Sequence, residues 1–501
     1  MAQSDRIPTD GTGVAVGAEA SPANVTDSGT MPVLVVDLDG TLIRTDMLLE
    51  SFWAACSANF LTPLQVLFRA PKGRAAVKRY LSGKTKIDPA TLPYNQDVID
   101  YIRAWRKRGG RTALVSASDE NIVRAIGEHL GIFDEIHGSD GKVNLKATRK
   151  AQFLRERFGE NGFAYVGDSR ADLAVWKTAA KAVTVGASAS LRARAEKACA
   201  QTEHIHSRSN SARALLKAIR PHQWLKNMLV FIPMIAGHKI DMETLVQSGL
   251  AFACFSLIAS SVYLLNDLLD LSADRVHPRK HRRPLASGDL PLMLGSLFAP
   301  LLLAAGVGLG TLLGPAFLAV MAGYYVVTMG YSFFLKRQML IDIVTLAGLY
   351  TIRILAGAAA TGIVLSFWLL AFSVFLFFAL ASVKRQAELI DSAQREVLKP
   401  SGRGYIIDDL PIVSQMATSS GFVSVLVLAL YLNSPAISAL YSQPAALWGL
   451  CLILLFWINR MVMVAHRGGM HDDPIVFAVK DRVSLLCGVV GVGCAAAGVL
   501  L

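Results

Sequence analysis

The stretch PVLVVDLDGT, residues 32–41, places two carboxylates directly after a continuous apolar run. Such a run, bounded by a turn, predicts a strand buried inside a parallel sheet. Asp37 and Asp39 then lie at the carboxyl end of that strand, where open parallel sheets bind their ligands. Two carboxylates at this spacing can divide the chemistry, because one can attack phosphorus while the other moves a proton.

Two further apolar runs, 111–116 and 163–167, follow this strand with helical patterns between them. Strands that alternate with helices predict a parallel, doubly wound α/β sheet of the Rossmann-like kind. Ser116 and Asp168 come at the ends of these runs, so we expect both beside the two carboxylates. Residues 44–95 are too long for a simple crossover, and their helical patterns predict a small helical cap over the site.

These motifs resemble the haloacid dehalogenase (HAD) superfamily, in the order DLDGT, LVSAS, a lysine and GDSRAD. Taken alone, DLDGT also fits an ordinary Asx-rich turn. The resemblance implies that Asp37 is the nucleophile of a phosphatase and Asp39 its general acid and base. Ser116 and Lys150, with Lys146 as the alternative lysine, would hold the phosphoryl oxygens. Phosphoryl transfer needs cations around a charge-rich centre, and the implied Mg²⁺ ligands are Asp37, Asp39, Asp168 and Asp172.

The second half of the chain is dominated by apolar segments close to the ~20 residues that a membrane helix needs. There are nine, the first of them short: 220–238, 243–268, 290–312, 314–334, 339–361, 365–383, 413–433, 443–463 and 483–501. They predict an all-α polytopic membrane domain of about nine transmembrane helices. We therefore expect a disordered tail over 1–30, the α/β domain over 31–190, a linker over 191–215 and the membrane domain over 216–501.

The net charge of +12 is placed as a membrane topology requires. If the N-terminal domain is cytoplasmic, the loops on its side hold nearly all the cations, whereas the opposite loops hold only Lys239. This follows the positive-inside rule and predicts an inner-membrane protein with its N-terminal domain and active sites facing the cytoplasm. It argues against nucleic acid as a partner. Six cysteines without a CxxC pair predict neither disulfides nor zinc.

A second polar cluster, NDLLDLSADRVHPRKHRRPLASG, begins at Asn266 where an apolar segment ends. Asn266, Asp270 and Asp274 are spaced i, i+4, i+8 and would share one helix face, with Asp267 beside it. Such a face at a membrane boundary is costly without a cation, and Mg²⁺ prefers carboxylates plus substrate phosphates. The basic run at 279–283 supplies charge for phosphate, although alone it also fits a topology signal or anionic-lipid contact.

This cluster resembles the first aspartate motif of the UbiA superfamily of membrane transferases. The pattern HPxKxxRPxASG is closest to its decaprenyl-phosphate phosphoribosyltransferase branch, which joins 5-phosphoribose to a polyprenyl phosphate. The resemblance implies a second Mg²⁺ site with the ligands Asn266, Asp267, Asp270 and Asp274. It implies substrate-binding residues along the rest of the domain: Lys226, Lys280, Arg283, Lys336, Asp342, Arg353, Lys384, Arg385 and Glu388.

One departure from the superfamily bears on the substrate. Its aromatic prenyltransferases carry a second Asp-rich motif after the sixth span, whereas this chain has VKRQAELIDSAQ at 383–394. A single Asp-rich motif with Lys384 and Arg385 favours phosphoribosyl diphosphate as donor and polyprenyl phosphate as acceptor. Asp472 and Asp473, in a later loop, are expected to be solvated.

The two resemblances together predict sequential reactions on one membrane face. The transferase product would keep a 5-phosphate on its ribose, and the HAD phosphatase would remove it to give polyprenyl-phosphoryl ribose. Two alternatives stay open: a UbiA-type prenyltransferase for an aromatic acceptor, with a phosphatase of unrelated substrate, and a non-enzymatic scaffold or transporter. Membrane lipids are expected partners, and the oligomeric state, a homo-oligomer included, is left open.

Overall fold

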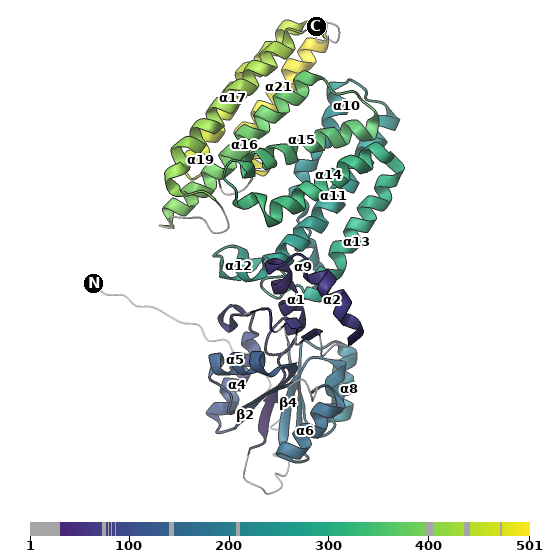
Figure 1. The fold of residues 1–501 in the computed structure, drawn as a ribbon, viewed down its shortest axis with the longest axis vertical. Helices are drawn as coiled ribbons and strands as arrows, with labels where there is room; N and C mark the ends of the chain where they lie inside the picture. The colour runs from purple at the N-terminus through teal and green to yellow at the C-terminus, as the bar shows by residue number, and fades with distance from the viewer. Residues whose placement is uncertain are drawn as a thin grey trace, which may run out of the picture.

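A computed structural model describes residues 31–500 apart from 73–76, 79, 82, 86, 140–144, 207–210, 396–403, 435–440 and 471–472. The tail over 1–30, expected to be disordered, lies outside these ranges. The described chain forms an α/β domain and a bundle of long helices, which lie end to end (Figure 1).

The α/β domain is built on six parallel strands in the order β3-β2-β1-β4-β5-β6. The three predicted strands form its centre: β1 (Val33–Val36) pairs with both β2 (Thr112–Asp119) and β4 (Phe163–Gly167). β3 (Glu135–Ser139), β5 (Lys181–Val185) and β6 (Thr202–Ile205) complete the sheet. The doubly wound α/β prediction is confirmed.

Helices cover both faces of this sheet, which explains the unbroken apolar run of β1. Leu34 and Val36 enter a core with α4 (Gln96–Lys107) and α5 (Glu120–Leu130). Val35 enters the opposite core, formed with α6 (Thr148–Phe158), α7 (Leu173–Trp176) and α8 (Ala189–Ala198). A strand buried on both faces brings its carboxyl end, and therefore Asp37, to a fixed place at the sheet edge.

The α/β domain continues beyond residue 190, which corrects the expected linker over 191–215. Residues 191–205 complete α8 and form β6, which pairs with β5 in the sheet. β6 is a four-residue edge strand with no fully buried position, so its sequence lacks the apolar run that marks the other strands. After it, α9 (Ser211–Ala218) packs Ala214 and Ala218 against the membrane helices. The domains are thus joined through packed elements.

Eight helices in the described part of the chain are long and apolar enough to cross a membrane. They are α11 (Met242–Leu269), α13 (Leu292–Gly310), α14 (Pro315–Phe333), α15 (Ile341–Thr361), α16 (Phe367–Gln394), α17 (Leu410–Leu432), α19 (Trp448–His466) and α21 (Arg482–Leu500). The segment expected as a short first span forms the 3-10 helix η4 (Pro221–Phe231) and the short α10 (Ile232–Ala236) instead. Gly357 of α15 lets η4 approach closely, because a Cβ there would lie 2.0 Å from the Val230 carbonyl oxygen.

The predicted cap forms, and it also docks the two domains. Its helix α1 (Met47–Ala58) is followed by α2 (Thr62–Arg69), and both lie between the sheet and the membrane helices (Figure 1). Glu50 of α1 forms a nearly buried ion pair, 2.5 Å long, with Arg275 of α12 (Leu271–Val276). Trp53 Nε1 donates a 2.9 Å hydrogen bond to Ser296 Oγ of α13.

Candidate functional site

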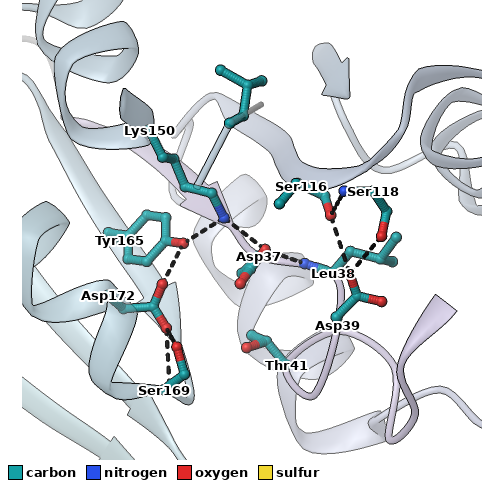
Figure 2. A network of polar contacts seen from close by, with 12 residues as sticks. Asp37, Leu38, Asp39, Thr41, Ser116, Ser118, Lys150, Tyr165, Ser169 and Asp172 are labelled. Atoms are coloured by element: carbon teal, nitrogen blue, oxygen red, sulfur yellow. Dashed lines mark hydrogen bonds and ion pairs between the residues drawn. The ribbon is translucent and has the colours of Figure 1, made fainter. Parts of the chain in front are cut away.

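Asp37 and Lys150 form the centre of the site in the α/β domain (Figure 2). Lys150 Nζ donates to Asp37 Oδ1 at 2.8 Å and to the Tyr165 hydroxyl at 3.0 Å. That hydroxyl in turn donates to Asp172 Oδ1 at 3.0 Å. The structure therefore brings Lys150, the preferred of the two candidate lysines, to the expected nucleophile.

Three carboxylates, those of Asp37, Asp168 and Asp172, gather within 4.8 Å of one another. Burial and the charge of Asp172 raise the pKa of Asp168 to about 8, and burial raises that of Asp37 above its ordinary value. A bound cation would relieve both causes, since it replaces lost solvation and neutralises the crowded charge. An all-oxygen donor set fits Mg²⁺, so these three residues would hold the metal.

The side chain of Asp39 lies outside this carboxylate cluster, so its expected role as a metal ligand stays a prediction. Its carboxylate accepts from Ser118 Oγ at 2.6 Å and from the Met47 N–H at 2.7 Å, while Ser116 Oγ is 3.5 Å away. Burial, and then the charge of Asp46, raise the pKa of Asp39 to about 6. Such a group holds a proton close to neutral pH, as a general acid must. Ser118 was missed, although it follows Ser116 by two residues at the same strand end.

Gly40 explains why the motif needs glycine at its fourth position. Its φ of +76° is left-handed, and a Cβ there would lie 2.4 Å from Asp168 Oδ2. Any other residue would strain the turn and displace a carboxylate of the cluster.

The pocket over these carboxylates is walled by both domains. Lys150, Asp168 and Arg44 line it from the α/β domain, and the segment 288–293 of the membrane domain lines it from the other side. Gly288 permits this contact: its φ is +76°, and a Cβ would lie 2.6 Å from the Arg44 Cβ. The expected phosphatase site therefore opens beside the end of the membrane bundle.

A second pocket lies within the membrane domain. Five of the predicted site residues line it together, drawn from four helices: Lys226, Asn266, Arg353, Lys384 and Glu388. Arg220, Arg279, Asp391 and Asp473 join them on its wall. Several cations around one cavity can bind a substrate that carries phosphate or diphosphate groups.

The aspartate motif is arranged differently from the single helix face expected. α11 ends at Leu269 and α12 starts at Leu271, so Asp270 stands at a break between helices. Its carboxylate faces Lys336 Nζ at 3.3 Å. Asp267 and Asp274 instead share Arg283, whose Nη1 lies 3.1 and 2.6 Å from their oxygens. Within the described chain, these residues do not gather as a metal cluster.

Oxygen donors suited to Mg²⁺ are nevertheless present at this second pocket. Asn266 Oδ1 is buried on the pocket wall with no hydrogen-bond partner among the described residues. An unpaired buried carbonyl oxygen is costly, and it is a ligand that Mg²⁺ accepts. Asn266 therefore fits a metal carried in with the substrate. Asp270 lies off the lining of the pocket and faces Lys336, and Asp267 and Asp274 hold arginines.

Asp342 and Arg385, both expected to bind substrate, pair with each other instead. Arg385 Nη2 lies 2.7 Å from Asp342 Oδ2, and Tyr331 donates to the same carboxylate at 2.8 Å. Both side chains are completely buried and lie off the lining of the pocket. The pair therefore joins α15 to α16 behind the pocket wall. Lys280, Arg283 and Lys336 also lie off the lining.

Asp473 is the functional candidate that the sequence reasoning dismissed as solvated. It is buried, and its carboxylate accepts from Lys226 at 2.8 Å, Lys384 at 3.1 Å and the Tyr350 hydroxyl. Its partners come from positions far apart in the sequence, so no local pattern could reveal them. Asp472, expected to be solvated as well, lies outside the described residues.

We expect Asp473→Asn to slow the membrane reaction strongly. The change removes the anion between two ammonium groups, which then repel each other and leave the pocket wall. Breaking a buried ion pair costs about 3 kcal/mol or more, and a loss of that size in the transition state lowers a rate roughly a hundredfold. The measurement is the rate of the transfer reaction predicted from the sequence, with exposed Asp408→Asn as control. An unchanged rate in Asp473→Asn would contradict the positioning role.

Comparisons with known proteins match one family to each of the two domains. Residues 228–478 match the UbiA prenyltransferase family, and residues 34–177 match haloacid dehalogenase-like hydrolases. Protein y4nM of Sinorhizobium fredii is 38% identical to this chain, and the match covers 91% of this chain and 89% of that protein. Nodulation protein NoeC of Azorhizobium caulinodans is 36% identical, and the match covers 54% of this chain and 88% of that protein. Decaprenyl-phosphate phosphoribosyltransferase of Mycolicibacterium smegmatis is 33% identical, and the match covers 55% of this chain and 88% of that protein.

Proposed function

We infer that this chain, which belongs to the UbiA prenyltransferase family and carries a haloacid dehalogenase-like hydrolase domain ahead of its membrane domain, works in two steps. The membrane domain transfers 5-phosphoribose from phosphoribosyl diphosphate to a polyprenyl phosphate. The HAD-like domain then removes the 5-phosphate from the lipid-linked ribose. The proposal includes an inner-membrane location, with both sites on the cytoplasmic side where the basic loops lie.

The transfer step is supported by the charges of the membrane pocket and by the relatives named decaprenyl-phosphate phosphoribosyltransferase. Both substrates carry phosphate, and Lys226, Arg353 and Lys384 present cations to them. The oxygen of the lipid phosphate attacks carbon 1 of the ribose, and the bond to the diphosphate breaks. Mg²⁺ bound by Asn266 would neutralise the diphosphate as it leaves.

The dephosphorylation step is supported by the arrangement around Asp37. A carboxylate oxygen of Asp37 attacks phosphorus, and the bond from phosphorus to the ribose 5-oxygen breaks. Asp39 gives its proton to that oxygen, and later accepts one from the water that releases inorganic phosphate from Asp37. Lys150 holds a phosphoryl oxygen, and Mg²⁺ bound by the three-carboxylate cluster would offset the charge of the phosphoryl group.

The single observation that carries the coupling is the shared wall of the phosphatase pocket. Segment 288–293 closes this pocket from the membrane side, so a phosphate presented at the membrane surface can enter where the two domains meet. A phosphatase for a small free metabolite needs no wall from a membrane domain.

The test is to incubate the purified full chain in lipid nanodiscs with phosphoribosyl diphosphate, a polyprenyl phosphate and Mg²⁺. We expect mass spectrometry to find the ribosyl lipid without its 5-phosphate. Turnover of a prenyl diphosphate on an aromatic acceptor, with no use of phosphoribosyl diphosphate, would favour the aromatic prenyltransferase instead.

Gly288→Ala tests the coupling in the same assay. The new Cβ would meet Arg44, and a left-handed residue with a Cβ is strained by about 1–2 kcal/mol, so the wall must move. We expect several-fold slower removal of the 5-phosphate from the lipid, with hydrolysis of p-nitrophenyl phosphate unchanged. The control is Gly308→Ala, where a Cβ meets nothing within 4 Å. Equal slowing on both phosphate substrates would contradict a role in presenting the lipid.

A further inference from the structure

The cap helix α2 carries an apolar face that no part of the described chain covers. We define the α2 apolar face as Phe60, Leu61, Leu64, Leu67 and Phe68, all of them exposed. Leu67 is 65% and Phe68 77% exposed. Soluble domains rarely gather large apolar side chains in this way without a partner.

The spacing of these residues places them on one side of the helix. Leu64, Leu67 and Phe68 recur at intervals of three and four, which is the period of a single helix face, and Phe60 and Leu61 directly precede the helix. The opposite side is fixed to the cap: Thr62 Oγ1 donates to the Ala55 carbonyl at 3.0 Å. Arg69 there lies 4.0 Å over the Tyr80 ring. The apolar face therefore points away from its own domain and cannot turn inward.

The α2 apolar face begins beside the end of the membrane bundle. The ring of Phe60 lies 6.4 Å from that of Phe334, which follows α14 and is itself exposed. The preceding cap helix α1 contacts α13 through Trp53 and Ser296, and Met293 and Leu297 of α13 expose further apolar side chains. The face is thus continuous with the belt of apolar residues on the spans.

The sequence around α2 is strongly basic. Residues 60–87 hold seven lysines and arginines and no acidic residue. An apolar helix face within a basic segment is typical of helices that lie in the surface of an anionic membrane, where apolar burial and attraction to lipid headgroups act together.

We propose that α2 lies in the interfacial layer of the lipid leaflet next to the α/β domain, with its apolar face among the lipid chains. Continuity with the spans and the basic charge both favour lipid over a second copy of this chain, because two copies would bring their basic segments together. The contact is independent of which phosphate the HAD-like domain hydrolyses. It anchors the cap to the membrane through lipid as well as through Glu50 and Trp53.

The test places a nitroxide spin label on the apolar face of the full chain. Leu64→Cys and Phe68→Cys are labelled separately in a chain with Cys487→Ala and Cys494→Ala, since the other four cysteines are buried. The chain sits singly in nanodiscs of phosphatidylcholine and phosphatidylglycerol. Asp100→Cys, on the exposed side of α4, is the control, and the readout is collision with oxygen against collision with a water-soluble nickel chelate.

We expect both labels on α2 to show a several-fold higher ratio of oxygen to nickel accessibility than the label at position 100. Ratios equal to the control would place the face in water and overturn the proposal. Low accessibility to both reagents, or dipolar broadening between labels, would show that protein covers the face and would overturn it equally.

Discussion

Asp37→Asn should leave the chain making the 5-phosphorylated ribosyl lipid and stop the reaction there. Asparagine keeps the shape of the side chain, but its amide has no oxygen nucleophilic enough to attack phosphorus. Loss of a covalent nucleophile lowers turnover by roughly a thousandfold or more. Mass spectrometry of the lipid fraction should therefore show the 5-phosphorylated product accumulating in place of the dephosphorylated one.

The separation of the two products makes this experiment decisive. Transfer in the Asp37→Asn protein should stay at the wild-type rate, which also shows that the variant folds. Asp100→Asn is the matched control, because Asp100 is exposed and its ion pair with Arg103 is 3.5 Å long. Continued dephosphorylation by the variant would contradict the nucleophile, and loss of both products would point to a failure of the whole chain.

The α/β fold and much of its site follow directly from local sequence. Each predicted strand ends in a polar residue of the site, and the carboxyl ends of parallel strands must meet at one edge. Asp37, Ser116 and Asp168 could be placed together for this reason. Lys150 lies on a helix, where a surface lysine looks the same in sequence, so only the fold distinguishes it from Lys146.

The features that were missed depend on contacts between distant parts of the chain. Asp473 looks like any loop acid until η4 and α16 bring Lys226 and Lys384 to it. Asp342 and Arg385 look like substrate ligands until α15 and α16 bury them as a pair. The break at Asp270 could not be inferred either, because the spacing i, i+4, i+8 assumes that one helix continues through it. Charges identify candidates, but packing decides which partner each charge takes.

Asp267→Asn is the change that should most damage the transfer reaction. Asp267 is 3% exposed, and its Oδ1 lies 2.5 Å from Arg220 and 3.1 Å from Arg283. Removing one member of a buried charge pair costs about 3–5 kcal/mol, and a loss of that size in the transition state slows a reaction roughly a hundred- to a thousandfold. We expect such a loss in the formation of either ribosyl lipid, measured with labelled phosphoribosyl diphosphate.

The HAD-like domain of the Asp267→Asn protein should hydrolyse p-nitrophenyl phosphate at the wild-type rate, because the three-carboxylate cluster lies entirely within the α/β domain. Glu243→Gln, an exposed change in the first turn of the same helix, should leave both activities intact. A variant that transfers normally would contradict any role for Asp267 in the site.

The Mg²⁺ dependence of the remaining activity separates two roles for Asp267, because the arginines and a metal would compete for the same oxygens. If Asp267 ligates Mg²⁺ when the diphosphate is bound, Arg220 and Arg283 must release it, and the asparagine variant should need a higher Mg²⁺ concentration for half-maximal transfer. If Asp267 only holds the arginines against the pocket, the Mg²⁺ requirement should stay the same while the KM for phosphoribosyl diphosphate rises. The pairing in the structure favours the second result, since both arginines already satisfy Asp267 and Asn266 Oδ1 has no such partner.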